Sequence, residues 1–473
     1  MNHDDVYMRD SDAFTWYMEA DPLLRSTIVS VVVFDEPPDL EQWLDRTERA
    51  SRVSPGFRHK VVHSPLRLAN PRWVVDPDFS LEFHARHLAV PAPGALGQVL
   101  EYACQTGMAG FDRARPLWEF TLLDGLEHGR AALVMKLHHS LTDGVGGMEM
   151  AKYLFDVERE AALVGPLPDA PAAELLSTAG LMRDAVRHQI ARTAGSAAAA
   201  VRGAPGLVAR ALRHPGDVVR DGVGVVGSVA RTVQPVNATL SPLMRDRRLA
   251  WQYDALTVPL DGLRGAARAV DLTLNDAFLG AISSGLLRYH ERHGSAVDEL
   301  RVTMPISIRK PDDPIGGNRI TLMRFKIPTR EHDLVTRMRS IDDLCLAARH
   351  EPAIPFTNVI ARALNRLPRT YVGGMLKHVD FVASNVPGID VPVYLAGAKV
   401  SEWYAFGPTI GSALNITLLS YNGTCYIGVT VDTAAIPDPG SMRECLREGF
   451  DEVVALGRDA GYRGTATQPS PAT

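Results

Sequence analysis

Two adjacent histidines followed by a short acidic turn are the residues of this chain best suited to chemistry. His138 and His139 end a hydrophobic run over residues 131–137, and Asp143 and Gly144 follow before a helical pattern that begins near residue 148. A histidine with an ordinary pKa of about 6.5 can accept a proton from a hydroxyl group at neutral pH. The pattern therefore predicts a general base, which acyl transfer requires.

The run before the histidines predicts a strand, and this constrains their roles. Successive strand residues point to opposite faces of a sheet, so His138 and His139 cannot both face one substrate. We expect one to be catalytic and the other structural. Asp143 is expected to form an ion pair or to cap the following helix, and Gly144 to adopt a backbone angle that other residues resist.

Other catalytic patterns receive less support. Adjacent histidines rarely share a metal ion, and the sequence shows neither HExxH nor a third ligand at useful spacing, so no metal is expected. No GxSxG pattern occurs, which leaves a serine acyl-enzyme without support. A GxGxxG pattern at Gly222, Gly224 and Gly227 follows only a short Val-Val pair in a helix-like stretch, so we interpret it as coincidental.

The elements around the histidines indicate two α/β domains. A chain of 473 residues exceeds one ordinary core, and 46% hydrophobic with 22% charged residues describes a globular protein. Strand-like runs cover residues 27–34 and 131–138, then resume at 301–308, 320–327 and 379–383. Asn422-Gly423 between runs 414–421 and 424–431 is a favoured hairpin turn.

Composition places the boundaries between these parts. Residues 161–250 are rich in Ala and Arg and open with prolines 166, 168 and 171. We therefore predict an N-terminal domain at 1–160, a helical crossover at 161–250, a C-terminal domain at 251–460 and a disordered tail at 461–473. Glycines and prolines at 203, 205, 206, 215 and 216 favour several short helices in the crossover.

Charge and cysteine usage exclude several classes of protein. The formal net charge of −5 gives no general attraction to nucleic acid. Four scattered cysteines without CxxC spacing predict neither disulfides nor zinc. The first twelve residues lack the pattern of a signal peptide, and the apolar runs are too short to span a bilayer. We therefore expect a cytoplasmic protein.

His138 through Gly144 complete the pattern HHxxxDG, and further short motifs follow the order of one family. On these residues the chain resembles the bacterial wax ester synthase/diacylglycerol acyltransferase family, within the wider HHxxxDG acyltransferases that include condensation domains and carnitine acyltransferases. The other matching motifs are Asp12-Ala13-Phe14, Pro116-Leu117-Trp118, Asn275-Asp276 within 273–278, residues 304–309, Gly317-Asn318 and Ser384-Asn385-Val386-Pro387-Gly388.

The resemblance implies two similar α/β domains that resemble CoA-dependent acyltransferases, with the active site in a channel between them. Acyl-CoA and a lipid alcohol would approach His139 from different sides. The second histidine would be the proton acceptor, and the alcohol would attack the thioester directly without a covalent enzyme intermediate. Asp143 would then support the loop. No cofactor is implied beyond acyl-CoA as substrate.

Four further residues are candidates for the channel or for an oxyanion site. Asn275 precedes an apolar helical run, so it is expected to cap that helix or to offer its amide to the developing oxyanion. Asp276 is expected to hold the loop. Asn318 and Asn385 lie in Gly- and Pro-containing motifs typical of turns and are expected to be structural or to line the channel. Pro116-Leu117-Trp118 is expected to pack in the core.

The crossover suggests two interpretations. Arginines 183, 187, 210, 213 and 220 accompany apolar residues at helical spacing, as in a helix that lies in a membrane interface. A helix packed on the two domains with a solvated basic face is the alternative, and the sequence slightly favours it. A peripheral position on the inner membrane or on lipid droplets follows from the first interpretation.

The leading hypothesis is esterification of diacylglycerol by acyl-CoA, which gives triacylglycerol. Esterification of a long-chain alcohol to a wax ester is the alternative within the same chemistry. A catalytically inactive lipid-binding member of the family is an alternative from another class, favoured if His139 is buried beyond reach. A condensation domain is weakened by the absence of carrier-protein modules. Basic side chains near the channel mouth are expected to bind the phosphates of CoA.

Overall fold

The computed structural model describes residues 6–459, except 55, 161–164, 174–175, 214–226, 230–233, 235, 308–319 and 332. Asn318, the glycines at 222 and 224, and the predicted tail at 461–473 lie outside the described residues.

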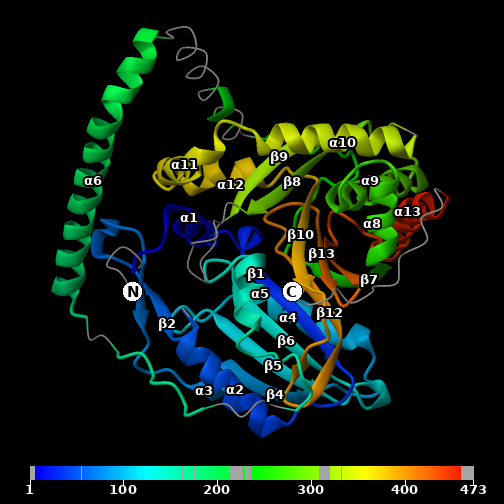
Figure 1. The fold of residues 1–473 in the computed structure, drawn as a ribbon, viewed down its shortest axis with the longest axis horizontal. Helices are drawn as coiled ribbons and strands as arrows, with labels where there is room; N and C mark the ends of the chain where they lie inside the picture. Colours follow the sequence, from blue (N-terminus) through cyan, green and yellow to red (C-terminus); the bar gives the residue numbers. More distant parts are fainter. Residues whose placement is uncertain are drawn as a thin grey trace, which may run out of the picture.

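Two six-stranded sheets form the frame of the molecule (Figure 1). The first sheet contains the strand that leads into the histidine pair. The strand beside it, which is rich in β-branched residues, pairs with it in antiparallel register, with Thr27 opposite His138. This mixed α/β architecture confirms the predicted fold class. In spatial order the first sheet consists of β11 (Tyr394–Leu395), β12 (Ala398–Phe406), β1 (Thr27–Phe34), β6 (Ala131–His138), β5 (Trp118–Asp124) and β4 (Ala85–Ala89).

The second sheet comes wholly from the C-terminal half. Its strands are, in spatial order, β7 (Trp251–Pro259), β14 (Thr424–Asp432), β13 (Leu414–Tyr421), β10 (Phe381–Ile389), β8 (Glu299–Ser307) and β9 (Ile320–Pro328). The predicted hairpin joins β13 to β14, with positive φ at both Asn422 and Gly423. A small ribbon of β2 (His59–Val62) and β3 (Arg72–Val75) lies beside the first sheet.

Helices cover both sheets and connect them. In the second half, α8, α9 and α13 pack together against the sheet, and α10 packs on α9 and β9 (Figure 1). The α-helices are α1 (Asp10–Met18), α2 (Leu40–Val53), α3 (Leu81–His84), α4 (Leu96–Met108), α5 (Gly144–Ala151), α6 (Thr178–Arg213), α8 (Leu260–Ala269), α9 (Leu274–Arg292), α10 (Leu334–Arg349), α11 (Thr357–Leu364), α12 (Arg369–Leu376) and α13 (Pro439–Asp459). Short 3-10 helices are η1 (Pro22–Leu24), η2 (Pro65–Arg67), η3 (Glu127–Gly129) and η4 (Ile354–Phe356).

One segment crosses from the C-terminal half into the first sheet. Strand β12 pairs with β1 in antiparallel register, Phe406 opposite Val29, and β11 extends the same edge. Residues 394–406 therefore complete the N-terminal sheet and do not follow the predicted division into sequential domains. Their strand pattern is visible in the sequence, but the partner of a strand is set by packing between distant segments.

Strand β10 corrects a second expectation. Residues 385–388 were predicted to form a turn, yet they lie inside β10 beside β13, where the register shifts between Val386 and Ile389. This shift absorbs the proline at 387. A Cβ atom built on Gly388 would lie 1.4 Å from the carbonyl oxygen of Ser420. Glycine is therefore required here by the close approach of the neighbouring strand.

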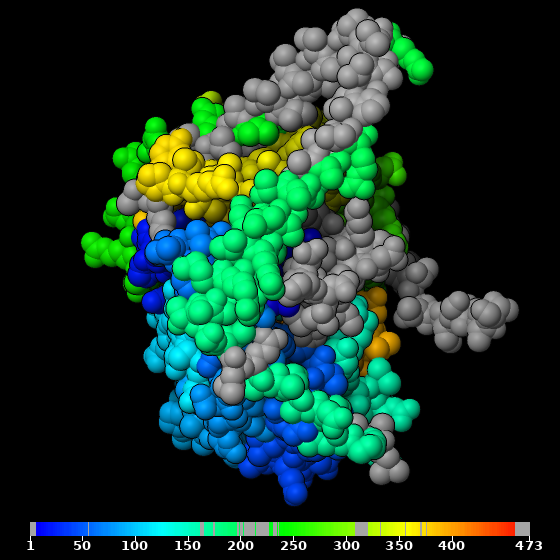
Figure 2. All heavy atoms as spheres, turned by 90° about the vertical axis from the view of Figure 1, so that its left-hand side faces the viewer, coloured from blue at the N-terminus to red at the C-terminus, as the bar shows by residue number. Residues whose placement is uncertain are grey.

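The crossover contains one 36-residue helix, α6, where the sequence predicted several short ones. Gly203, Pro205 and Gly206 lie within it, because the many helix-forming alanines around them outweigh three unfavourable residues. Figure 2 shows α6 lying across one face of the molecule. Its first half contacts the N-terminal part through Arg72–Asp184 (3.1 Å) and the stacked rings of Tyr7 and His188. No helix in the described ranges is long and apolar enough to cross a membrane.

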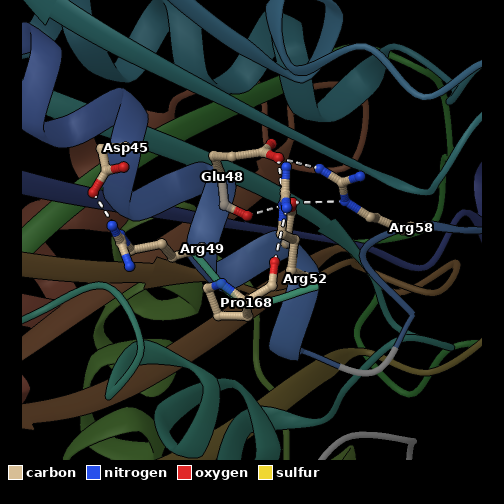
Figure 3. Close-up of polar contacts among 7 residues, drawn as sticks. Asp45, Glu48, Arg49, Arg52, Arg58 and Pro168 are labelled. Atoms are coloured by element: carbon tan, nitrogen blue, oxygen red, sulfur yellow. Dashed lines mark hydrogen bonds and ion pairs between the residues drawn. The ribbon is translucent and has the colours of Figure 1, made fainter. Parts of the chain in front are cut away.

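Charged side chains of α2 hold the start of the crossover (Figure 3). Glu48 accepts hydrogen bonds from Arg52 and Arg58 at 2.7 and 2.5 Å, which orients both guanidinium groups. Arg52 then donates to the carbonyl of Pro168 at 2.7 Å, and Arg49 donates to the carbonyl of Gly165 at 2.6 Å. The crossover is thus fixed to the N-terminal lobe before α6 begins.

We predict that Gly388→Ala lowers the free energy of unfolding by about 1–3 kcal/mol or more, because the added methyl group displaces Ser420 from its ladder. Gly97→Ala is the matched control, since nothing lies within 4 Å of a Cβ at this position of α4. The control should leave stability unchanged or raise it by up to about 1 kcal/mol. Urea unfolding of both variants tests this, and equal stabilities would contradict the close-approach explanation.

Candidate active site

His138 is held in the core at the end of β6. Its ring is fully buried, with edge contacts to Trp16 and Phe111. Nδ1 accepts a hydrogen bond from the backbone N–H of Ser140 at 3.0 Å, so the ring proton sits on Nε2. Nε2 lies 3.0 Å from Oε1 of Glu19. These contacts give His138 a structural position.

Glu19 follows the last residue of α1 and binds several groups at once. Burial raises the pKa of its carboxyl group, but the contact with His138, the Ser26 N–H and the charge of Arg113 outweigh burial, so the pKa lies below its ordinary value. The Ser26 N–H donates to Glu19 at 3.0 Å, and the Ser26 carbonyl accepts from the N–H of His139 at 2.8 Å. One short segment thus positions both histidines.

His139 lies one residue past β6 and lines a pocket of about 300 Å³. The pocket is bounded by α1, β9, α11 and α12, and most of its lining side chains are apolar, such as Phe14, Leu322 and Leu376. Ser11, Thr15 and Ser26 add hydroxyl groups to the lining. The arrangement places an imidazole beside a cavity suited to an apolar chain.

Asp143 begins α5 directly after the histidine pair. Its carboxylate accepts a hydrogen bond from the N–H of Gly146 at 2.7 Å, so it is the N-cap of this helix. Burial lowers the pKa of His139 below its ordinary value of 6.5, and the nearby charge of Asp143 opposes part of this shift. Asp143 therefore shapes the loop and also raises the affinity of His139 for a proton.

Gly144 does not have the unusual backbone angle predicted for it. It is the first residue of α5 and is not among the described glycines with positive φ. The glycine instead permits close packing, because a Cβ atom here would lie 3.0 and 3.1 Å from the two methyl groups of Val386 on β10. The HHxxxDG turn therefore packs directly against the strand that carries the Ser384–Gly388 motif.

The remaining candidates are distributed as follows. The N-cap of α9 is Thr273, so the prediction that Asn275 caps this helix is wrong. Asn275 is buried, contacts Cys345 and is not among the described lining residues of the His139 pocket. Asp276 closes a capping box by accepting from the N–H and hydroxyl of Thr273. Asn385 lies within β10, and it too is outside the described pocket lining.

The Pro116–Trp118 motif supports the histidines from the neighbouring strand. Leu117 and Trp118 are fully buried, and Trp118 donates to the carbonyl of Phe57 at 2.7 Å. The carbonyl of Leu117 accepts from the N–H of His138 at 3.0 Å. The motif thus packs in the core as expected.

Sequence reasoning missed Arg324, which also lines the His139 pocket. Burial and the charge of Arg301 lower the pKa of Arg324 to about 10, so its guanidinium stays charged at neutral pH. Its place opposite Thr303 on β8 could not be known before β8 and β9 were paired. The alternation of inward and outward residues along a strand could have indicated that Arg324 points inward. Burial along β9 does not alternate regularly, so this signal is weak.

The two sheets and the HHxxxDG turn define a class of acyltransferase that has two lobes. Residues 8–278 match the model of the wax ester synthase/diacylglycerol acyltransferase catalytic domain, and residues 316–453 match that of the WS/DGAT C-terminal domain. The chain therefore belongs to the wax ester synthase/diacylglycerol acyltransferase family, as the sequence resemblance predicted, and it is an acyltransferase.

Relatives agree with this assignment over nearly the whole chain. A Mycobacterium tuberculosis protein named as a diacylglycerol O-acyltransferase is 37% identical over 443 residues, which are 93% of this chain and 89% of that protein. A second M. tuberculosis protein named in this way is 27% identical, over 93% of this chain and 94% of its own length.

Solved structures show the same fold. The wax ester synthase/diacylglycerol acyltransferase from Marinobacter aquaeolei VT8 covers 96% of this chain and 100% of its own, with a TM-score of 0.61 and 20% identity. The first condensation domain of the calcium-dependent antibiotic synthetase covers 96% of each chain, with a TM-score of 0.62 and 14% identity.

We predict that Asp143→Ala lowers the free energy of unfolding by about 0.5–2 kcal/mol, because α5 loses its cap. Asp143→Asn should lose much less, since an amide oxygen can also accept from the Gly146 N–H. Urea unfolding compares the two variants. If the asparagine variant is as unstable as the alanine variant, the carboxylate charge rather than capping stabilises this turn.

Proposed function

We propose that the protein transfers the acyl group of a long-chain acyl-CoA to the hydroxyl group of diacylglycerol, which yields triacylglycerol and CoA. The observation that carries this proposal is the unequal placement of the two histidines. His138 is bound to Glu19 in the core, whereas His139 lines an apolar pocket. A base beside an apolar cavity suits a reaction between two lipid-like substrates.

The proposed mechanism needs one proton acceptor and no covalent enzyme intermediate. Neutral His139 accepts the proton of the acceptor hydroxyl as its oxygen attacks the thioester carbonyl carbon. The tetrahedral intermediate then collapses, its carbon–sulfur bond breaks, and the CoA sulfur leaves with the proton from the His139 imidazolium. Every proton is accounted for within the two substrates and His139, so we propose that no cofactor takes part.

Arg324 is our candidate for stabilising negative charge in this pocket. Asn275, the candidate from the sequence, contacts Cys345 and is not among the described lining residues. A guanidinium in a largely apolar cavity attracts developing negative charge more strongly than it would in water. Arg324 is therefore a better candidate than Asn275 to face the oxyanion.

The choice of diacylglycerol as acceptor follows the names of the relatives. Both Mycobacterium tuberculosis proteins described above are named for this acceptor. Wax ester synthesis from a long-chain alcohol uses the same base and the same bond changes, and the family name includes it. An inactive lipid-binding role would be favoured by an unreachable His139, but His139 lines the pocket.

A lipid acceptor must be reached at a membrane or droplet surface. Leu66, Ile190 and Val359 are exposed apolar side chains on η2, α6 and α11. We propose that the protein works from the cytoplasm and touches such a surface peripherally through side chains of this kind.

We predict that His139→Ala lowers the rate of ester formation by about a hundredfold to ten-thousandfold, the usual contribution of a general base. The measurement uses labelled long-chain acyl-CoA with diacylglycerol or with a long-chain alcohol, which also identifies the preferred acceptor. His87→Ala is the matched control, because His87 is exposed on β4 at the far edge of the first sheet. Full activity in His139→Ala, or no ester from wild type with either acceptor, would contradict the proposal.

We predict that kcat/KM falls at low pH with a midpoint below 6.5, because burial lowers the pKa of His139 and only the neutral imidazole accepts a proton. Asp143→Asn removes a charge that favours the imidazolium, so the midpoint should move to still lower pH. Rate profiles of both proteins over pH 4–8 test this, at about one-unit steps or finer. A midpoint that rises in the variant would exclude His139 as the titrating base.

A further inference from the structure

A second pocket, of about 550 Å³, adjoins the His139 pocket along α1. Phe14 and Met18 on α1 and Leu364 on α11 line both pockets. Asp10 and Tyr17 face the second pocket, whereas Ser11 and Thr15 face the first. The two cavities therefore lie along neighbouring faces of α1 and share an apolar wall made by α1 and the end of α11.

The second pocket is strongly basic. Arg67, Arg192, Arg362 and Arg366 line it, and Asp10 is the one acidic residue among its described lining residues. The lining thus carries a formal charge of +3, from four arginines and one aspartate, in a chain whose net charge is −5. By contrast, the described lining of the His139 pocket contains Arg324 and Glu351, which balance.

Asp10 organises two of these arginines. Its carboxylate Oδ2 lies 2.8 Å from Arg192 and 3.1 Å from Arg362, and Oδ1 accepts from the amide of Asn70 at 2.9 Å. Asp10 is only 7% exposed, so this cluster is built into the wall. Two guanidinium groups on one carboxylate retain a positive charge, and their remaining N–H groups are available to a ligand.

Three distant parts of the chain meet at this cluster. Arg67 comes from η2, Arg192 from the crossover helix α6, and Arg362 from α11 in the C-terminal half. Figure 1 shows α1, α6 and α11 on the same side of the molecule, and Figure 2 shows α6 lying over that side. The crossover therefore contributes a wall of the pocket as well as a covalent link.

We propose that this basic pocket binds the phosphate-bearing nucleotide end of acyl-CoA, while the thioester reaches His139 in the adjoining pocket. The proposal rests on the proposed function. Arginine is well suited to phosphate because its planar N–H groups bind two oxygens at once. The shared wall of Phe14, Met18 and Leu364 is apolar, which suits a pantetheine arm that passes from one pocket to the other.

A phospholipid headgroup shares the phosphate chemistry but fits the geometry less well. A membrane surface is recognised by basic side chains that project outward. Here Arg192 and Arg362 are instead bound to a buried carboxylate inside a concave site that adjoins the pocket of the proposed base. The nucleotide end of acyl-CoA matches the basic pocket, and its acyl end matches the apolar pocket.

The test compares two acyl donors. S-acyl-N-acetylcysteamine carries the same thioester as acyl-CoA but has no nucleotide. In Arg192→Ala and Arg362→Ala, the ratio of kcat/KM for acyl-CoA to that for S-acyl-N-acetylcysteamine should fall at least about tenfold, the loss of one charged hydrogen bond. Arg187→Ala is the matched control. Arg187 is exposed on α6, the helix that carries Arg192, and its substitution removes the same charge. It should keep the ratio of wild type.

Equal losses with both donors would mean that the arginines only support the fold, and the proposal would be wrong. Titration calorimetry with CoA alone separates this site from the proposed reaction. Weaker CoA binding in Arg192→Ala and Arg362→Ala supports the site even if wild type forms no ester. If CoA binding is unchanged while binding to phosphatidylglycerol vesicles falls, the pocket recognises a headgroup and the proposal fails.

Discussion

The contact between His138 and Glu19 is the interaction on which the rest of the site depends. It joins the end of α1 to the end of β6, two segments that are 119 residues apart in the chain. Through Ser26, the same segment also holds the backbone of His139. Removing the imidazole would leave a buried carboxylate without its donor, which commonly costs about 1–3 kcal/mol or more. The histidine that stays in the core thus orients the histidine that lines the pocket.

The two lobes share structure around this contact, so neither is complete without the other. Strand β12 brings C-terminal residues into the sheet that carries His138, and Tyr253 of β7 stacks on Phe406 with ring centroids 4.3 Å apart. Val386 of β10 packs against Gly144 at the start of the helix that follows the histidines. The His139 pocket is lined by residues of both lobes, so these ties hold its walls in place, which suits the proposed reaction between two positioned substrates.

Local features were predictable from the sequence, and features made by distant partners were not. The Asp143 cap and the Asn422-Gly423 hairpin carry their geometry in neighbouring residues, so turn chemistry sufficed for them, whereas the angle at Gly144 depends on packing against Val386 and was predicted wrongly. Residues 385–388 have turn-forming composition, yet β13 holds them in a strand whose register shift accommodates them. Asn275 lies two residues after the N-cap position of α9, and Thr273 occupies that position. The arginines of the basic pocket come from three segments, at Arg67, at Arg192 and at Arg362 with Arg366, which are separated by more than a hundred residues, and no periodicity connects the three.

The distribution of charge between the two cavities mirrors the chemistry of an acyl thioester of CoA. Such a molecule has a polyanionic end and an apolar end, and transferring the wrong end into either environment is unfavourable. A basic cavity with a formal charge of +3 beside a largely apolar cavity with a balanced lining favours one orientation of such a molecule. In the proposed complex, this orientation brings the thioester, which lies between the two ends, to the region of His139. The same proposed complex keeps the phosphates out of the apolar cavity, where burial lowers the pKa of His139 and so favours the neutral imidazole that the proposed reaction needs.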